Sequence, residues 1–263
     1  ETIHYVENIS KIKKKDDLGL PNSILFLPKY IIIFDNKKNK VTISSPILST
    51  ETINEDYEKI KKEFNIIEKN ILIKRPKDNI DIKLRKKLKP ISNIHKNKFI
   101  KNINKAKNYI KNGDIFQVVL GQRFNVDFSK DASSLYKVLR VTNPSPFMFY
   151  FNFPNFDIVG SSPEILVRVQ NKKITIRPIA GTRPRGNNRK EDYKYEKELL
   201  SDQKELSEHL MLLDLGRNDA GKVSKKNSVK VTSSFFIERY SHVMHIVSNV
   251  EGILKSKISS IKA

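Results

Sequence analysis

The sequence predicts an α+β fold in which mostly antiparallel sheets are flanked by a few long helices. Short stretches rich in β-branched and aromatic residues, separated by turn residues, predict the strands. Longer stretches with apolar residues at helical spacing predict the helices. Of the 263 residues, 38% are hydrophobic and 30% are charged, which is typical of a folded globular protein rather than a disordered one.

The first part of the chain predicts a hairpin followed by a helix. Residues 23–34 and 41–44 are rich in apolar β-formers and predict two strands, and the polar residues 35–40 predict the turn that joins them. Residues 52–69 predict a helix, because apolar side chains recur there at helical spacing, namely Ile53, Tyr57, Ile60, Phe64 and Ile67.

A basic stretch with two prolines divides the chain. The 263 residues of the whole chain could form either one large domain or two small ones, so chain length does not decide between them. Residues 71–95 are basic and contain Pro76 and Pro90, and they predict a linker. We therefore expect one domain over residues 1–70 and a second over residues 96–263.

The sequence of the second domain predicts helices and strands in mixed order. Residues 98–112 predict a helix that ends at Gly113, and residues 115–128 are rich in β-formers and predict a strand. Residues 193–215 predict one long helix with a leucine stripe and Gly216 at its end. No glycine-rich phosphate loop occurs in the sequence, so nucleotide chemistry is not indicated. Further strands are predicted at residues 147–153, 157–160, 164–169, 173–178 and 235–250.

The strong positive charge has two interpretations. Fifty Lys and Arg against 29 Asp and Glu give a formal net charge of +21, which by itself suggests binding to nucleic acid. Lysine is, however, enriched together with Asn and Ile, and all three have A/T-rich codons, so a biased genome explains the excess. The basic runs also lack interleaved aromatic residues and any known nucleic-acid-binding motif. We therefore expect no nucleic-acid partner.

Cysteine usage and hydropathy indicate a cytoplasmic protein. The chain contains no cysteine, which excludes disulfides and thiolate metal sites and fits a reducing compartment. The longest apolar run, residues 24–34, is interrupted by Pro28 and Lys29 and is too short to span a bilayer. We expect neither a membrane segment nor a signal peptide.

Six sequence segments occur in one order along the chain and carry the functional signal. They are GDIFQVVLGQRF (113–124), NPSPFMFYF (143–151), GSSPEILVRV (160–169), IRPIAGTRPRG (176–186), DQKELSEHLMLLDLGRND (202–219) and ERYSHVMHIVSNVEG (238–252). Together they resemble the chorismate-utilising enzymes, and among these the large subunit (component I) of anthranilate synthase. The resemblance implies a layered α/β/β/α fold. It also implies a lyase that converts chorismate and ammonia to anthranilate and pyruvate in tryptophan biosynthesis.

Two glutamates are candidate ligands for Mg²⁺. Chorismate is a dicarboxylate, so an enzyme that binds it benefits from a divalent cation that holds a carboxylate. Glu205 and Glu208 are three residues apart on a predicted helix and therefore share a face, which suits oxygen coordination of Mg²⁺. Spacing alone also fits a solvated acidic stripe; the resemblance implies that both carboxylates, Glu208 foremost, hold the metal.

Four residues are candidates for binding or converting the ring. The hydroxyl of chorismate is a poor leaving group and needs an acid, and the resemblance implies that Glu164 supplies the proton. Gly181 and Thr182 lie where a strand ends in a turn, and the resemblance implies that they contact the substrate. His245 alternates with apolar Met244 and Ile246, a pattern that a core histidine also shows; the resemblance implies that it orients the ring or handles a proton.

Two positions discriminate among the related reactions. By resemblance, enzymes that add water to chorismate carry a lysine base at the position of Gln117, and glutamine cannot deprotonate water. Aminodeoxychorismate synthases typically carry a lysine at the position of Ala180, and alanine supplies no nucleophile. Both residues are expected at the substrate site, and both favour direct amination by ammonia.

The resemblance also implies partners and a regulator. Without cysteine the chain has no nucleophile for glutamine hydrolysis, so ammonia would come from a separate glutamine amidotransferase subunit, component II. Pro146, Phe147 and Met148 lie in a segment that resembles part of a tryptophan-binding site. Feedback inhibition needs a second, N-terminal element that this sequence lacks.

We expect the chain to be a fragment. It opens with Glu1, and neither the N-terminal block nor the C-terminal catalytic segment of the family occurs in it. We predict that the isolated chain binds Mg²⁺ and chorismate poorly and turns over negligibly. Three alternatives stay open from the sequence: an aminodeoxychorismate synthase, a noncatalytic remnant of such an enzyme, and a basic nucleic-acid-binding module.

Overall fold

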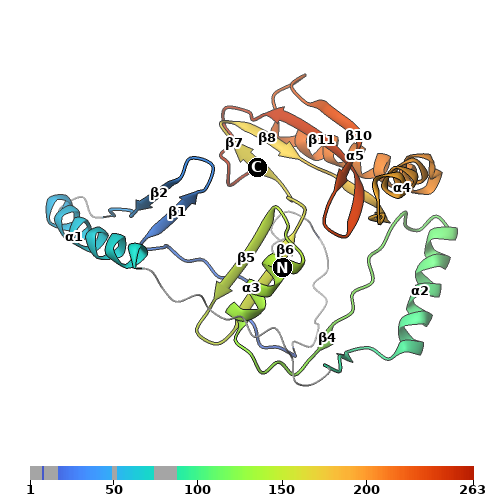
Figure 1. Cartoon of the computed structure of the whole chain (residues 1–263). Helices are drawn as coiled ribbons and strands as arrows, with labels where there is room; N and C mark the ends of the chain where they lie inside the picture. Colours follow the sequence, from blue (N-terminus) through green and yellow to red (C-terminus); the bar gives the residue numbers. More distant parts are fainter. Residues whose placement is uncertain (1–7, 9–16, 49–51, 74–87) are drawn as a thin grey trace. The chain divides into compact units, whose positions relative to one another are not determined.

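The chain divides into two compact units. They comprise Glu1–Asp78 and Asn79–Ala263. The structure, a computed structural model, describes residues 8, 17–48, 52–73 and 88–263 (Figure 1). Most of the predicted linker over residues 71–95 lies outside the described residues, because positions 74–87 are not among them.

The first unit contains an antiparallel hairpin and a helix, which are β1 (Ile31–Asp35), β2 (Lys40–Ser44) and α1 (Ile53–Leu72). The Asp35 carboxylate accepts hydrogen bonds from the backbone N–H groups of Lys37 and Lys38 at 3.1 and 3.0 Å, which closes the hairpin turn. Phe64 of α1 lies edge-on to Tyr30 with ring centroids 6.0 Å apart. The predictions of a hairpin and a helix are confirmed, although the first strand begins later than residue 23.

The second unit contains the remaining elements, which are β3 (Ile91–Ser92), α2 (Lys96–Lys111), β4 (Phe124–Asn125), α3 (Ala132–Thr142), β5 (Phe147–Asn152), β6 (Asp157–Ser162), β7 (Arg168–Gln170), β8 (Lys173–Ile176), β9 (Ile179–Pro184), α4 (Arg189–Ser201), α5 (Gln203–Val223), β10 (Lys230–Arg239) and β11 (Val243–Ile253). Helix α2 ends as predicted, with Gly113 in the left-handed conformation at φ 80°. Strands β5 and β6 form an antiparallel hairpin on which α3 packs.

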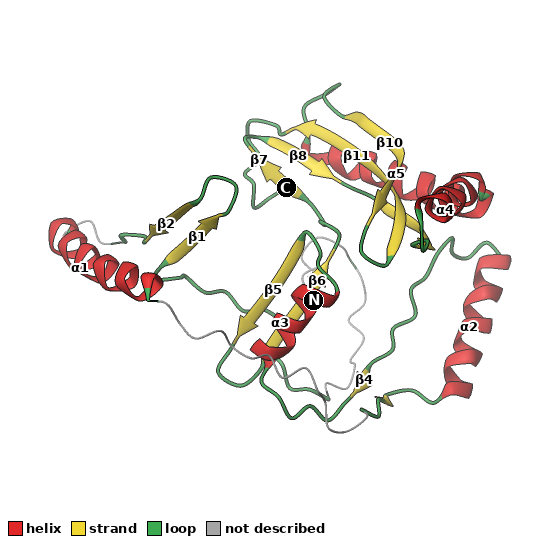
Figure 2. Cartoon of the chain, in the orientation of Figure 1, coloured by secondary structure: helices red, strands yellow, loops and turns green. Residues whose placement is uncertain are grey.

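The main sheet of the second unit is antiparallel. Its strands lie in the order β10-β11-β8-β7, and β9 also pairs with β11. Helices α4 and α5 pack on this sheet, and α5 contacts β8, β9, β10 and β11 (Figure 2). Antiparallel sheets with packed helices make the fold α+β, as the sequence predicts.

The hydrophobic core lies between this sheet and the two helices. Leu199 of α4 packs with Met244 and Ile246 of β11, and all three are fully buried. Leu213 and Ala220 of α5 form a second cluster with Val250 of the same strand, so β11 carries both parts of the core. Within the described part of the chain, no helix is both long enough and apolar enough to cross a membrane.

The predicted strand over residues 115–128 is wrong. Only Phe124 and Asn125 of this segment form a strand, which pairs with β3. Phe116 and Val119 are 89% and 87% exposed. High β-propensity reflects packing against neighbouring strands, and among the described residues no strand pairs with positions 115–123. The segment therefore stays irregular.

The predicted single helix over residues 193–215 is also wrong, because two helices, α4 and α5, meet at Asp202. The Asp202 backbone is extended, and its carboxylate accepts hydrogen bonds from the N–H groups of Lys204 and Glu205 at 3.0 and 3.2 Å. This N-cap starts a new helix. Gly216, predicted at the helix end, lies inside α5, where the missing side chain allows the helix to approach Ile176 of β8.

Further corrections concern strands. The predicted single strand over residues 235–250 is a hairpin, because the chain turns between β10 and β11 and the Tyr240 N–H donates to the Val243 carbonyl at 2.8 Å. The strand predicted over residues 164–169 begins only at Arg168, so Glu164 lies in the preceding loop. Helix α3 and strands β3 and β9 were not predicted. Gly181 and Thr182, expected where a strand ends in a turn, lie inside β9.

A buried histidine joins α5 to β11. His209 is fully buried, and its Nε2 lies 2.7 Å from Ser248 Oγ, which in turn accepts a hydrogen bond from the Phe235 backbone N–H at 3.0 Å. Its Nδ1 has no hydrogen-bond partner among the described residues. An unpartnered buried N–H costs more than an unpartnered lone pair, so neutral His209 carries its proton on Nε2.

We expect this histidine to make the chain less stable in mild acid. Burial lowers the pKa of His209 below its usual value of 6.5, so the unfolded chain binds a proton more readily than the folded chain. The free energy of unfolding should therefore be highest above about pH 6.5 and fall as the pH drops below that value. Thermal unfolding between about pH 7.5 and 5 measures this. His209→Gln keeps an N–H near Ser248 but cannot titrate, so its stability should depend less on pH than that of the parent chain. Equal pH dependence of the two chains would contradict this role of His209.

Candidate active site

The candidate site is built around a break in the pairing of β9 with β11. Met244 pairs with Arg183 and Ile246 pairs with Ala180, with an irregularity between these pairs. Two residues of β9, Gly181 and Thr182, therefore oppose a single residue of β11, His245. The irregularity re-aims these side chains.

Three predicted residues meet at this irregularity. The Nδ1 atom of His245 lies 2.9 Å from the Gly181 carbonyl oxygen and 3.1 Å from Thr182 Oγ1. A carbonyl oxygen only accepts, so in neutral His245 the proton is on Nδ1. The Nε2 atom is then an acceptor. His245 is half-buried, whereas its neighbours Met244 and Ile246 are fully buried, which confirms the predicted alternation.

Glu164 lies in the loop between β6 and β7. The Ser162 hydroxyl accepts a hydrogen bond from the Glu164 backbone N–H at 3.2 Å and lies 3.2 Å from the Glu164 carbonyl oxygen, which shapes the loop. The side chain is exposed, but neighbouring groups displace part of its water, and this desolvation raises the pKa of its carboxyl group. The charge of His245 opposes part of the rise, so the two side chains interact.

A group that the sequence did not single out lies beside His245. Glu238 of β10 is directly opposite His245, and it forms an ion pair with Arg177. The Tyr240 hydroxyl donates to Glu238 at 2.6 Å, and the Tyr240 ring lies 5.6 Å from the His245 ring. Burial, and then the hydrogen bond to Glu238, raise the pKa of Tyr240, so this hydroxyl stays protonated near neutral pH.

The two candidate metal carboxylates lie in the first two turns of α5 and are both half-buried. Glu205 Oε1 lies 3.7 Å from Arg183 Nη1, and a Cβ atom at Gly181 would lie 3.3 Å from Glu205 Oε2. Glu208 Oε1 accepts a hydrogen bond from Gln117 Nε2 at 3.0 Å. The described residues contain no group of three or more His, Cys, Asp or Glu that could hold a metal.

This donor set fits Mg²⁺ as a partial shell. Mg²⁺ is usually held by one or two carboxylates, with water and ligand oxygens in the other positions. Glu205 and Glu208 are two such carboxylates, and no hydrogen bond from the described residues reaches Oε2 of either one. No third acidic residue, His or Cys of the described chain gathers with them to complete the shell.

The remaining predicted residues are separated. Ala180 is 8% exposed, so its side chain belongs to the core beneath β9. Pro146 lies with Tyr240 around a shallow cavity of about 490 Å³, whereas Phe147 lines a different cavity with Arg177. Met148 is half-buried in β5. Pro146 and Phe147 thus line different cavities.

Known proteins resemble the chain over its whole length. Anthranilate synthase component 1 of Acetivibrio thermocellus is 45% identical over 260 residues, which cover 97% of this chain and 52% of that protein. The crystal structure of anthranilate synthase component I from Streptococcus pneumoniae TIGR4 matches with a TM-score of 0.87 and 35% identity, over 99% of this chain and 57% of the other. A putative 2,3-dihydroxybenzoate-specific isochorismate synthase from Bacillus anthracis matches with a TM-score of 0.60 and 25% identity, over 69% and 50% of the two chains.

The chain spans about half the length of the curated relatives it matches. The sequence model of the chorismate binding enzymes matches residues 1–263, which is the chain from end to end. The chain therefore belongs to the chorismate binding enzyme family.

Proposed function

We propose that the chain is part of an anthranilate synthase component 1, which converts chorismate and ammonia to anthranilate, pyruvate and water. The observation that carries this proposal is the arrangement of Glu164, His245 and the Gly181–Thr182 bulge. The high similarity to proteins named anthranilate synthase component 1 supports the choice of reaction.

The roles follow from the chemistry of each group. Ammonia forms a carbon–nitrogen bond to the ring, and the hydroxyl leaves as water with the proton of Glu164. The raised pKa of Glu164 keeps that proton available at higher pH than an ordinary glutamate would. His245 presents an unprotonated Nε2 that can accept a hydrogen bond or a proton from the aminated ring. Cleavage of the enolpyruvyl ether then releases pyruvate and leaves anthranilate.

Glu205 and Glu208 are the residues that would hold Mg²⁺. When bound, the ion supplies positive charge for a substrate carboxylate. Gln117 donates a hydrogen bond to Glu208 and so orients the Glu208 carboxylate. The Thr182 hydroxyl, 3.1 Å from His245 Nδ1, would contact the ring together with His245.

Gln117 and Ala180 support amination by ammonia over related reactions. Glutamine at position 117 is not a base for water, so addition of water is disfavoured. The buried Ala180 offers no amine, so a covalent aminated intermediate on this residue is excluded. We further propose a cytoplasmic protein that receives ammonia from a glutamine amidotransferase subunit. Pro146, Phe147 and Met148 are candidate contacts of that whole protein with tryptophan.

Product analysis tests the proposal. The protein encoded by the full open reading frame that contains this chain, called the full-length protein, is incubated with chorismate, ammonium and Mg²⁺. The products are identified by mass. We expect anthranilate and pyruvate. An aminated product that keeps the enolpyruvyl group would shift the assignment to aminodeoxychorismate synthesis, and a hydroxylated isomer would shift it to isochorismate synthesis.

The 263-residue chain alone is the matched control for this assay. We expect it to form anthranilate at a negligible rate, because it spans about half the length of the proteins named anthranilate synthase component 1. Turnover by this chain comparable to that of the full reading frame would contradict the expectation.

A further inference from the structure

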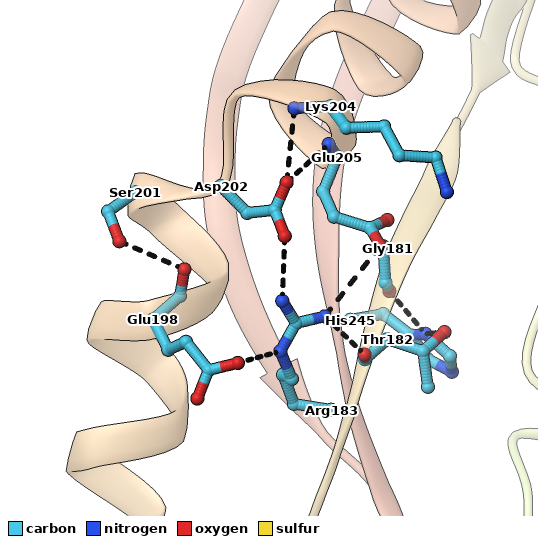
Figure 3. Close-up of polar contacts among 9 residues, drawn as sticks. All are labelled: Gly181, Thr182, Arg183, Glu198, Ser201, Asp202, Lys204, Glu205 and His245. Atoms are coloured by element: carbon cyan, nitrogen blue, oxygen red, sulfur yellow. Dashed lines mark hydrogen bonds and ion pairs between the residues drawn. The ribbon is translucent and has the colours of Figure 1, made fainter.

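One arginine contacts both halves of the candidate site. Arg183 of β9 donates through Nε to Glu198 at 2.8 Å and through Nη2 to Asp202 at 2.9 Å (Figure 3). Its Nη1 donates to the Thr182 carbonyl oxygen at 3.0 Å and lies 3.7 Å from Glu205 Oε1. The side chain is only 17% exposed. All three nitrogens of the guanidinium group are therefore engaged.

The first contact with the site is to the backbone of the bulge in β9. The carbonyl oxygen of Gly181 accepts from His245 Nδ1, and the next carbonyl oxygen, that of Thr182, accepts from Arg183 Nη1. Two consecutive carbonyl groups of the bulge are thus held by different side chains. Loss of the second bond would remove the side chain that holds the carbonyl group next to the one that binds His245.

The second contact is to the start of α5. Asp202 is the N-cap of this helix, and Glu205 lies in its first turn. Arg183 binds both of these residues, so it fixes the beginning of the helix against β9 (Figure 3). Three carboxylates surround one guanidinium group, because Glu198 also binds it. The excess negative charge leaves Glu205 able to attract a cation.

We propose that Arg183 is a positioning residue that holds the Gly181–Thr182 bulge of β9 against His245 and, at the same time, holds Glu205 in place for Mg²⁺. This inference rests on the proposed function for the role of Mg²⁺, whereas the effect on His245 does not depend on it. Lysine cannot replace Arg183, because an ammonium group lacks the planar fork that reaches four partners in fixed directions.

The first test measures the tautomer of His245 by ¹⁵N NMR of the 263-residue chain at about pH 8, where histidine is neutral. The signal is assigned by its loss in His245→Gln. The parent chain should show His245 with its proton on Nδ1. Arg183→Lys and Arg183→Gln should lose this single form and show a mixture with the proton on Nε2. A loss of stability alone would lower the unfolding temperature without changing the tautomer in the folded chain.

Arg239→Lys is the matched control. Arg239 also joins the main sheet to α4, through an ion pair with Glu196, but it contacts none of Thr182, Asp202 or Glu205. It should leave the tautomer of His245 unchanged. Arg183→Lys keeps a positive charge near the three carboxylates, so it tests the proposal if Arg183→Gln does not fold.

The second test measures the Mg²⁺ concentration that half-saturates anthranilate formation by the full open reading frame. Arg183→Lys should raise it roughly 10- to 100-fold, the usual effect of removing a group that orients a metal ligand. Arg239→Lys should not. If no anthranilate forms but the tautomer changes only in the Arg183 variants, the proposed function fails and the positioning of His245 stands. An unchanged tautomer, or an unchanged Mg²⁺ requirement in an active enzyme, overturns the inference.

Discussion

In the protein encoded by the full open reading frame, Glu164→Gln is expected to lower the turnover of chorismate roughly 10²- to 10⁴-fold, the usual contribution of a general acid. Glutamine keeps the shape of the side chain but has no proton to transfer to the leaving hydroxyl. Since Glu164 lies in an exposed loop, the fold and the binding of chorismate should change little. Single-turnover rates of anthranilate formation, with a thermal unfolding curve for each variant, measure the two effects separately.

The pH dependence of turnover gives a second sign of this role. A general acid must be protonated to act, so turnover should fall as the pH rises through the pKa of Glu164. Desolvation raises this pKa above the ordinary value of 4.5, and the charge of His245 only partly offsets the rise. The decline should therefore lie at higher pH than for an unperturbed glutamate, and it should be absent from the residual rate of Glu164→Gln.

Glu251→Gln is a suitable control for Glu164→Gln. Glu251 is another carboxylate of the same unit, and its ion pair with Lys173 at 3.0 Å lowers its pKa, so it is no proton donor near neutral pH. Its substitution should leave turnover unchanged. Full activity of Glu164→Gln, or an equal loss in both variants, would show that another group protonates the hydroxyl.

Local sequence patterns predicted the elements that local interactions decide. Helices α1 and α2 and the first hairpin follow from periodicity and turn residues. The break at Asp202 was missed because apolar periodicity continues on both sides of it. Asp202 followed three positions later by Glu205 is an N-terminal helix signal, and it could have placed the break. Asp131 is a similar signal for the missed helix α3, because its carboxylate caps the helix by accepting from the Ser134 backbone N–H.

The site depended on pairing that no local pattern contains. Gly181 and Thr182 meet His245 only because β9 pairs with β11 across an irregularity, and register is a property of two strands. Glu238 was missed because residues 235–250 were interpreted as a single strand. The turn at Tyr240 folds β10 back, and this turn places Glu238 directly opposite His245. Side chains that converge by pairing need the fold before they can be found.

Gly181→Ala is expected to lower the free energy of unfolding of the chain by about 2–5 kcal/mol, as measured by urea denaturation. Gly181 has φ 72°, a left-handed conformation that costs other residues about 1–2 kcal/mol. The added Cβ would also lie 3.0 Å from Leu199 Cδ1 and 3.3 Å from Ile246 Cδ1, within the buried core. Overpacking of this kind typically costs about 1–3 kcal/mol more.

Gly113→Ala separates the cost of the left-handed backbone from the cost of overpacking. Gly113 has φ 80°, but a Cβ there would meet none of the described atoms within 4 Å. This variant should therefore lose only the backbone term of about 1–2 kcal/mol. The difference between the two variants measures the crowding at Gly181. Equal losses would mean that the core relaxes around the new methyl group at no cost.

The same methyl group should also disturb Glu205, the carboxylate proposed to hold Mg²⁺. The Cβ at position 181 would lie 3.3 Å from Glu205 Oε2, so either the bulge or this carboxylate must shift by a few tenths of an ångström. At a temperature where both variants are folded, the full reading frame with Gly181→Ala should need more Mg²⁺ for half-maximal anthranilate formation than the one with Gly113→Ala. An identical requirement would show that Gly181 is needed only for the backbone of the bulge and that the approach of Glu205 to Gly181 has no part in the chemistry.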